Sequence, residues 1–205
     1  TPLDLYRFAN SRDKGISFRT ALGAKANATL MVGDASGTKS SNGQTHAVYA
    51  RLGMPVSEGL VADLYGDWSK KGVGQTWSTV KGELFWQKNG SKAGLMLAAH
   101  RQKGSGPAYN VTVASLYGES KGAFAGWTPF ARLDLLSNSV PEGDKAEYMK
   151  LSKTGKPTLV ILGVRREIFP DIELAPSLTW VKYRGGGSPA PSSDVFLRLT
   201  MSAKF

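Results

Sequence analysis

The last twelve residues of the chain, DVFLRLTMSAKF (194–205), alternate between two kinds of side chain. The odd-numbered positions are apolar: Val195, Leu197, Leu199, Met201, Ala203 and Phe205. The even-numbered positions are mostly polar: Phe196, Arg198, Thr200, Ser202 and Lys204. Successive side chains of a β-strand point to opposite faces, so the stretch predicts a strand with one apolar and one polar face. An edge strand of a soluble β-sandwich is the alternative.

The same alternation continues toward the N-terminus. Residues 172–184 repeat it, and the short turn 169–171 joins them to an earlier strand at about 158–168. The glycine- and proline-rich segment 185–193 reads as a loop. A tight turn therefore lies on one side of this strand and a long loop on the other, as in barrels with short periplasmic turns and longer outer loops.

Loops and turns alternate along the whole chain. Loops are expected at 10–14, 34–44, 70–75, 102–107, 138–145 and 185–193. Tight turns are expected at 23–26, 55–58, 88–91, 119–122 and 169–171. Asn89-Gly90 favours the positive φ angles of a type I′ hairpin turn. This rhythm predicts a single domain over 1–205: an all-β, closed antiparallel up-and-down transmembrane β-barrel of twelve strands, with ten as the alternative and both termini on the short-turn side.

The composition agrees with a barrel. Hydrophobic residues make up 41% of the chain and its mean hydropathy is −0.23. No run approaches the 18 or so apolar residues that a membrane helix needs, but only alternate residues of a barrel strand face lipid. Without cysteine the chain has no disulfide or thiolate chemistry. Its first residues do not read as a signal peptide, so we expect either a protein that is not exported or the mature form of an exported one.

A final strand that ends in an aromatic residue, here Phe205, resembles the outer-membrane β-barrel proteins of Gram-negative bacteria as a class. The resemblance implies location in the outer membrane, periplasmic termini, and contact with membrane lipid and lipopolysaccharide. Aromatic residues near predicted strand ends suit an interfacial girdle. They are Trp68, Trp77, Trp86, Trp127 and Trp180.

The expected strand number, the start Leu3-Asp4-Leu5-Tyr6-Arg7 and the terminal Phe205 also resemble the small monomeric porins for acidic oligosaccharides, of the oligogalacturonate and sialic-acid types. This finer resemblance implies a monomer rather than a trimer, and a passive channel for small anionic solutes. The family has a strongly cationic pore. The interior expected here departs from that pattern, because it mixes charges of both signs.

Placing the apolar side chains toward lipid assigns the other side chains to the lumen. The expected lumenal cations are Arg19, Arg51, Lys81, Arg132, Arg165, Arg198 and Lys204. The expected anions are Asp63, Asp67, Glu83, Asp134, Glu167 and Glu173. Most of the net charge of +10 therefore falls in loops and strand ends, where it suits anionic head groups or an electropositive entrance. Arg51, Arg132, Arg165 and Arg198 would form a basic track, with Tyr49 and Tyr65 beside it.

These assignments favour a porin-like channel for small hydrophilic, anionic solutes without cofactor or metal. A structural or adaptor barrel with a lumen filled by side chains is the alternative, followed by a barrel enzyme. The chain has two histidines, His46 and His100, and neither forms the His-x-Ser pattern of lipid-processing barrels. His100 falls on the lumenal side, where we expect Asp63 or Asp67 opposite it. We expect neither catalysis nor nucleic-acid binding, since the basic residues are spread over all loops.

Overall fold

The computed structural model describes residues 5, 6, 8, 13–23, 25–36, 45–122, 124–145, 149–185 and 191–203. They form one antiparallel sheet of eleven strands and one turn of 3-10 helix, η1 (Gly143–Lys145). The strands are β1 (Gly15–Leu22), β2 (Ala26–Gly33), β3 (His46–Ser57), β4 (Leu60–Gly72), β5 (Gln75–Lys88), β6 (Ser91–Lys103), β7 (Tyr109–Glu119), β8 (Thr128–Leu136), β9 (Lys156–Phe169), β10 (Ile172–Arg184) and β11 (Asp194–Ala203).

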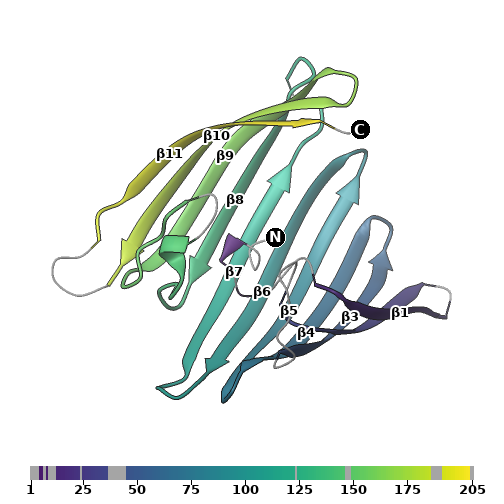
Figure 1. Cartoon of the computed structure of the whole chain (residues 1–205). Coiled ribbons are helices and arrows are strands. Elements are labelled where there is room, and N and C mark those ends of the chain that lie inside the picture. Colours follow the sequence, from purple (N-terminus) through teal and green to yellow (C-terminus); the bar gives the residue numbers. More distant parts are fainter. Residues whose placement is uncertain are drawn as a thin grey trace.

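Each strand pairs with the next one in the chain, from β1 to β11 (Figure 1). The predicted all-β, antiparallel, up-and-down topology is confirmed. The predicted final strand is also confirmed: β11 pairs with β10 from Asp194 to Ala203. Lys204 and Phe205, the end of the expected motif, lie outside the described residues.

The hairpin turns follow the local sequence. Asn89 and Gly90, between β5 and β6, both have positive φ (52° and 76°), as predicted for a type I′ turn. The connection between β4 and β5 was expected to be a loop but is a two-residue turn, because Gly74 adopts a positive φ of 69°. Between β7 and β8 the connection is longer than the predicted tight turn, and a bridge between Phe124 and Trp127 closes it.

The described sheet contains eleven strands, one fewer than expected. The missing strand was expected before Asn10, where the structure describes only Leu5, Tyr6 and Phe8. None of these three residues is in a strand. Backbone pairing does not join β1 to β11 among the described residues. The predicted barrel closure and the twelfth strand are therefore not established by this sheet.

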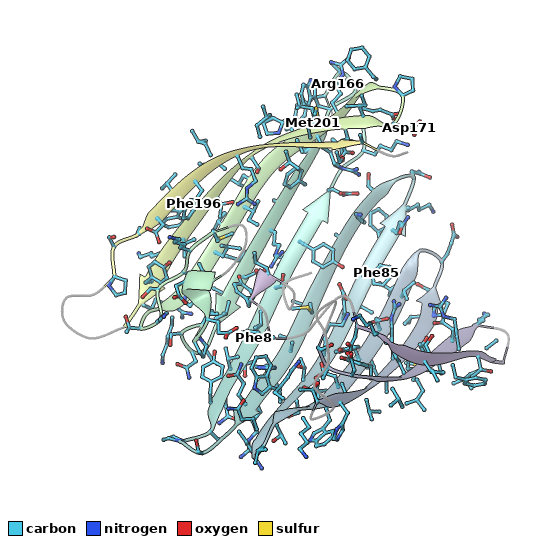
Figure 2. The ribbon with its side chains drawn as sticks, viewed as in Figure 1. Phe8, Phe85, Arg166, Asp171, Phe196 and Met201 are labelled. Carbon is cyan, nitrogen blue, oxygen red and sulfur yellow. The ribbon has the colours of Figure 1, made fainter. Side chains whose placement is uncertain are left out.

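The two faces of the sheet differ in burial. Figure 1 shows that the sheet is strongly curved, and Figure 2 shows Phe8 on its concave side. On β6 the even positions from Gly94 to His100 are buried, whereas the odd positions between them are exposed. Cross-strand register extends this division to every strand, because directly paired residues share a face.

An apolar cluster covers part of the concave face. Its buried members come from β6 to β10, from the β8–β9 connection and from the N-terminal segment: Tyr6, Phe8, Met96, Ala98, Val111, Val113, Leu136, Val140, Met149, Leu151, Leu159, Val181 and Tyr183. Tyr6 is 1% exposed and Phe8 is 3% exposed. Burial of each large side chain contributes roughly 1.5–3 kcal/mol. The cluster thus holds the N-terminal segment against the sheet.

The described part of the chain contains no helix of the length and apolar character required to cross a bilayer.

Candidate functional site: the concave face of the sheet

The residues that were expected to line the lumen lie on the concave face wherever the structure describes them, and Lys204 lies outside the described residues. This placement follows from the cross-strand register, which connects each of them to buried inward-facing neighbours. They are Arg19, Arg51, Asp63, Asp67, Lys81, Glu83, His100, Arg132, Asp134, Arg165, Glu167, Glu173 and Arg198. The structure gathers most of the charged ones into three ion-paired groups.

The first group centres on Asp63, which is 1% exposed. Its Oδ2 accepts a hydrogen bond from Nε of Arg51 at 2.5 Å, and its Oδ1 lies 3.0 Å from Nζ of Lys81. Lys81 also contacts Glu83 at 2.7 Å, and the hydroxyl of Tyr117 donates to Glu83 at 2.5 Å. A buried carboxylate is costly unless it is paired, and here two cations offset the cost.

The second group is the most deeply buried. Asp134 is 0% exposed and accepts from Nε of Arg132 at 2.9 Å, with Nη2 of the same guanidinium on its other oxygen. The Tyr6 hydroxyl donates to Asp134 at 2.6 Å. Burial raises the pKa of Tyr6 well above its usual range, and the charge of Asp134 raises it further. Tyr6 therefore remains protonated and ties the N-terminal segment to β8.

The third group surrounds Arg165. Its Nη1 donates to Glu173 at 2.8 Å and its Nη2 to Glu119 at 2.9 Å, while Nζ of Lys92 lies 3.2 Å from Glu119. Glu119 and Lys92 were not predicted to face the lumen, because Glu119 falls within the predicted turn 119–122 and Lys92 directly follows the predicted turn 88–91. Extending the alternation of β7 from Tyr117 to its last residue would have placed Glu119 on the inner face.

The near balance of inward charges persists in the structure. Besides Lys92 and Glu119, the concave face gains Lys71, which donates to the Ala35 carbonyl at 2.9 Å, and Asp194, which accepts from Tyr183 at 2.9 Å. Two cations and two anions are thus added, and Asp13 adds one further anion beside the Tyr49 hydroxyl.

His100 does not contact either carboxylate that was expected opposite it. Its Nδ1 lies 3.0 Å from the Thr79 hydroxyl, and its Nε2 lies 3.2 Å from the Gln102 amide. The Phe8 ring stacks on the imidazole at a centroid distance of 4.7 Å, on the concave side of the sheet (Figure 2). The strand register explains why the predicted His100–carboxylate contact is absent. His100 pairs with Thr79 on β5, and Asp67 lies one strand further away, on β4.

Ion pairs with carboxylates also change the predicted basic track of arginines. Arg51, Arg132 and Arg165 are each bound to carboxylates. Arg19 lies exposed on β1 and has no ion-pair partner in the described part of the chain. Sequence parity placed these side chains on the correct face but did not reveal which of them are neutralised.

The tryptophans divide between the two faces. Trp68, Trp86 and Trp180 are exposed on the convex face, as a girdle requires. Trp77 instead lies inside: its indole contacts His100 edge-on at 5.7 Å, and Nζ of Lys71 lies 5.2 Å from the ring centre. Trp127 lies in the β7–β8 connection beneath the guanidinium of Arg166, 5.7 Å away. Figure 2 shows Arg166 near Asp171, at the end of the sheet where β9 turns into β10.

A cavity of about 570 Å³ lies on the concave face between the first and third charged groups. Its walls include Tyr117, Phe130 and Met96 together with charged side chains of both groups and Arg132 of the second group. The volume falls within the range of roughly 300–1,000 Å³ that is usual for small-molecule sites. This cavity is the part of the concave face that is best suited to hold a solute.

The convex face carries large exposed apolar side chains on nearly every strand. Those at least half exposed on the strands are Ile16, Phe18, Leu22, Leu30, Val32, Val56, Val80, Leu97, Leu116, Leu162, Phe169, Val195, Leu197, Leu199 and Met201. A soluble monomer rarely exposes such an extensive apolar surface.

In the described residues, no group of three or more His, Cys, Asp or Glu side chains is arranged to hold a metal ion. No protein-family model matches this sequence, and a search of curated proteins finds no relative.

Proposed function

We propose that this chain is a transmembrane β-barrel of a Gram-negative outer membrane, through which small hydrophilic solutes diffuse passively. One observation carries the proposal: the sheet exposes its apolar side chains on the convex face and keeps its paired charges on the concave face. A soluble sheet has the opposite polarity, whereas barrel strands in lipid turn apolar residues outward.

Strand length supports the proposal. β4 and β6 each contain 13 residues, and 13 residues of strand extend roughly 43 Å. A tilt of about 45° would reduce this length to a height of roughly 30 Å, the thickness of a bilayer's hydrocarbon core. The convex face would then contact lipid and, in the outer leaflet, lipopolysaccharide.

The proposal requires the sheet to close. Since eleven is an odd number, β1 and β11 run in the same direction, and direct pairing between them would be parallel. Barrels with an odd number of strands exist. An unpaired strand edge in lipid would leave backbone groups without partners at a cost of several kcal/mol each, so we expect β1 and β11 to pair within a monomer.

The same proposal includes a modest preference for anions. The ion-paired side chains of the concave face contribute little net electric field. The preference for anions therefore rests on exposed cations such as Arg19 and on the surplus of positive charge in the loops and turns between strands. The apolar cluster around Tyr6 and Phe8 narrows the path. Small solutes are therefore favoured over oligosaccharides.

Single-channel recording in planar bilayers tests the channel. We expect stable current steps and a reversal potential that indicates a preference for anions over cations. Arg19→Glu should lower that preference measurably, because it reverses an exposed charge on the concave face. Lys25→Glu makes the same charge change in the β1–β2 turn and should have a smaller effect. Folded, inserted protein that carries no current would contradict the channel proposal.

A second candidate function, a structural barrel with a filled lumen, is favoured by the apolar cluster that holds Tyr6 and Phe8 on the concave face. If this reading is correct, wild-type protein is silent in the bilayer. The double variant Tyr6→Ala/Phe8→Ala would then conduct, because it removes two large side chains from the interior. Equal conductance of wild type and double variant would exclude a plug formed by these two rings.

A further inference from the structure

The cavity on the concave face has flat aromatic walls. Tyr117 on β7 lies over Gly94 of β6, and Phe130 on β8 lies over Gly163 of β9. A Cβ atom on either glycine would overlap the ring of its neighbour. The glycines therefore let both rings lie close against the sheet, so that an apolar surface remains between the charged groups.

Each charged side chain that lines this cavity is paired with a side chain of opposite charge. Lys81 contacts Glu83, and Arg165 bridges Glu119 and Glu173. Lys92 adds a second cation to Glu119. The remaining lining cation, Arg132, is paired with Asp134. Cations and anions thus occur together around the aromatic walls, and no lining cation is left unpaired to select an anion.

A ligand of one charge would have to break such a pair and leave one partner uncompensated, which is costly. A ligand with both a carboxylate and an ammonium group can replace each broken pair with a new one. Its apolar part can meanwhile cover Tyr117 and Phe130. Aromatic stacking adds favourable energy beyond the burial of area.

We propose that this cavity binds small zwitterions that carry an apolar or aromatic side chain, of which an aromatic α-amino acid is the simplest. The inference rests on the proposed function, since it names the class of solute that the barrel interior retains. Phe130 forms the apolar wall, and Glu119 balances the two cations beside it.

Calorimetric titration of the full chain, folded in detergent micelles, tests this proposal with L-phenylalanine as the probe. Phenylacetate and phenethylamine serve as matched ligands that each lack one charge. We expect L-phenylalanine to bind about tenfold more tightly than either of them. Phe130→Ala should weaken its binding about tenfold, whereas Leu133→Ala, which removes an exposed side chain from the convex face of the same strand, should leave it unchanged.

The charge of Glu119 provides a second readout. Glu119→Gln leaves Lys92 without its carboxylate and Arg165 with Glu173 alone, so the cavity becomes more positive. We expect this variant to bind phenylacetate more tightly than wild type does and to lose its preference for L-phenylalanine. A variant that is merely destabilised would lose both ligands, and protease resistance of the folded barrel checks for this.

The proposal is overturned if L-phenylalanine does not bind, if it binds no better than phenylacetate, or if Phe130→Ala binds it as wild type does. These outcomes are independent of conductance. Binding without current would contradict the channel proposal but support the binding site. Current without binding would support the channel but contradict the binding site.

Discussion

At the scale of single residues, Asp134 is the group on which the interior depends most. Asp134 is fully buried, its charge compensates that of Arg132, and it accepts a hydrogen bond from the Tyr6 hydroxyl. Its charge could be read from the sequence. Its role as an anchor for the N-terminal segment could not, because Tyr6 lies 128 positions away in the chain.

Asp134→Asn should lower the free energy of unfolding by about 3 kcal/mol, since it leaves the guanidinium of Arg132 without a countercharge. Asp194→Asn makes the same change on the same face, at a carboxylate that accepts from a neutral tyrosine. It should cost only about 1 kcal/mol. Urea unfolding in lipid vesicles measures both values, and equal losses would contradict the anchoring role of Asp134.

A second residue-scale prediction concerns Asp34, which follows β2. The side chain and backbone N–H of Ser36 donate to this carboxylate, and they hold its pKa at about 2, below the ordinary 3.8. Because the folded pKa is depressed, these hydrogen bonds contribute to folding above pH 3.8, and the contribution is lost as the pH falls through about 2.

Carboxyl NMR shifts of Asp34 should therefore titrate near pH 2 in the folded protein. Ser36→Ala should raise the midpoint toward 3.8, because it removes the side-chain donor. An unchanged midpoint in this variant would show that Ser36 is not the cause.

At the scale of elements, glycines decide how neighbouring strands pack. Gly163 on β9 has the Phe130 ring and the Pro176 carbonyl where a Cβ would lie, whereas Gly82 on β5 has only a methyl group of Leu64 at 3.7 Å. Both glycines are within strands, so sequence alone does not distinguish them. The positions of the aromatic rings on the next strands do.

Gly163→Ala should destabilise the folded sheet by about 1–3 kcal/mol, because the ring and backbone around it must move. Gly82→Ala should have no cost or should stabilise slightly, since it reduces the entropy of the unfolded chain. Thermal or urea unfolding compares the pair. A larger loss at Gly82 than at Gly163 would contradict the packing described for Phe130.

At the scale of the whole molecule, the proposed barrel depends on whether β1 pairs with β11. β1 and β11 start at the same end of the sheet and run in the same direction. Direct closure therefore brings a parallel pair together, with their exposed apolar residues, such as Phe18 and Leu197, on the same outer face.

The absence of native cysteine allows a direct test of closure. Phe18→Cys is combined in turn with Val195→Cys, Leu197→Cys, Leu199→Cys or Met201→Cys, all on the outer face. We expect one combination to form an intramolecular disulfide under oxidation, since its Cα atoms must come within about 7 Å. Gel mobility detects the cross-link. Only intermolecular cross-links, or none, would show that β1 and β11 do not pair within a monomer.

The sequence by itself determined the alternation of apolar and polar side chains, the hairpin order and the face on which each described lumenal residue lies. These properties are local, since strand geometry has a period of two and turns depend on a few residues. Only the tertiary structure decided that Tyr6 and Phe8 pack inside, that His100 contacts Thr79, and that Arg51, Arg132 and Arg165 are paired with carboxylates. Such contacts join residues far apart in the chain. The alternation of DVFLRLTMSAKF could therefore orient β11, while the neighbours of Arg198 and of every other inward charge depend on how all the strands assemble.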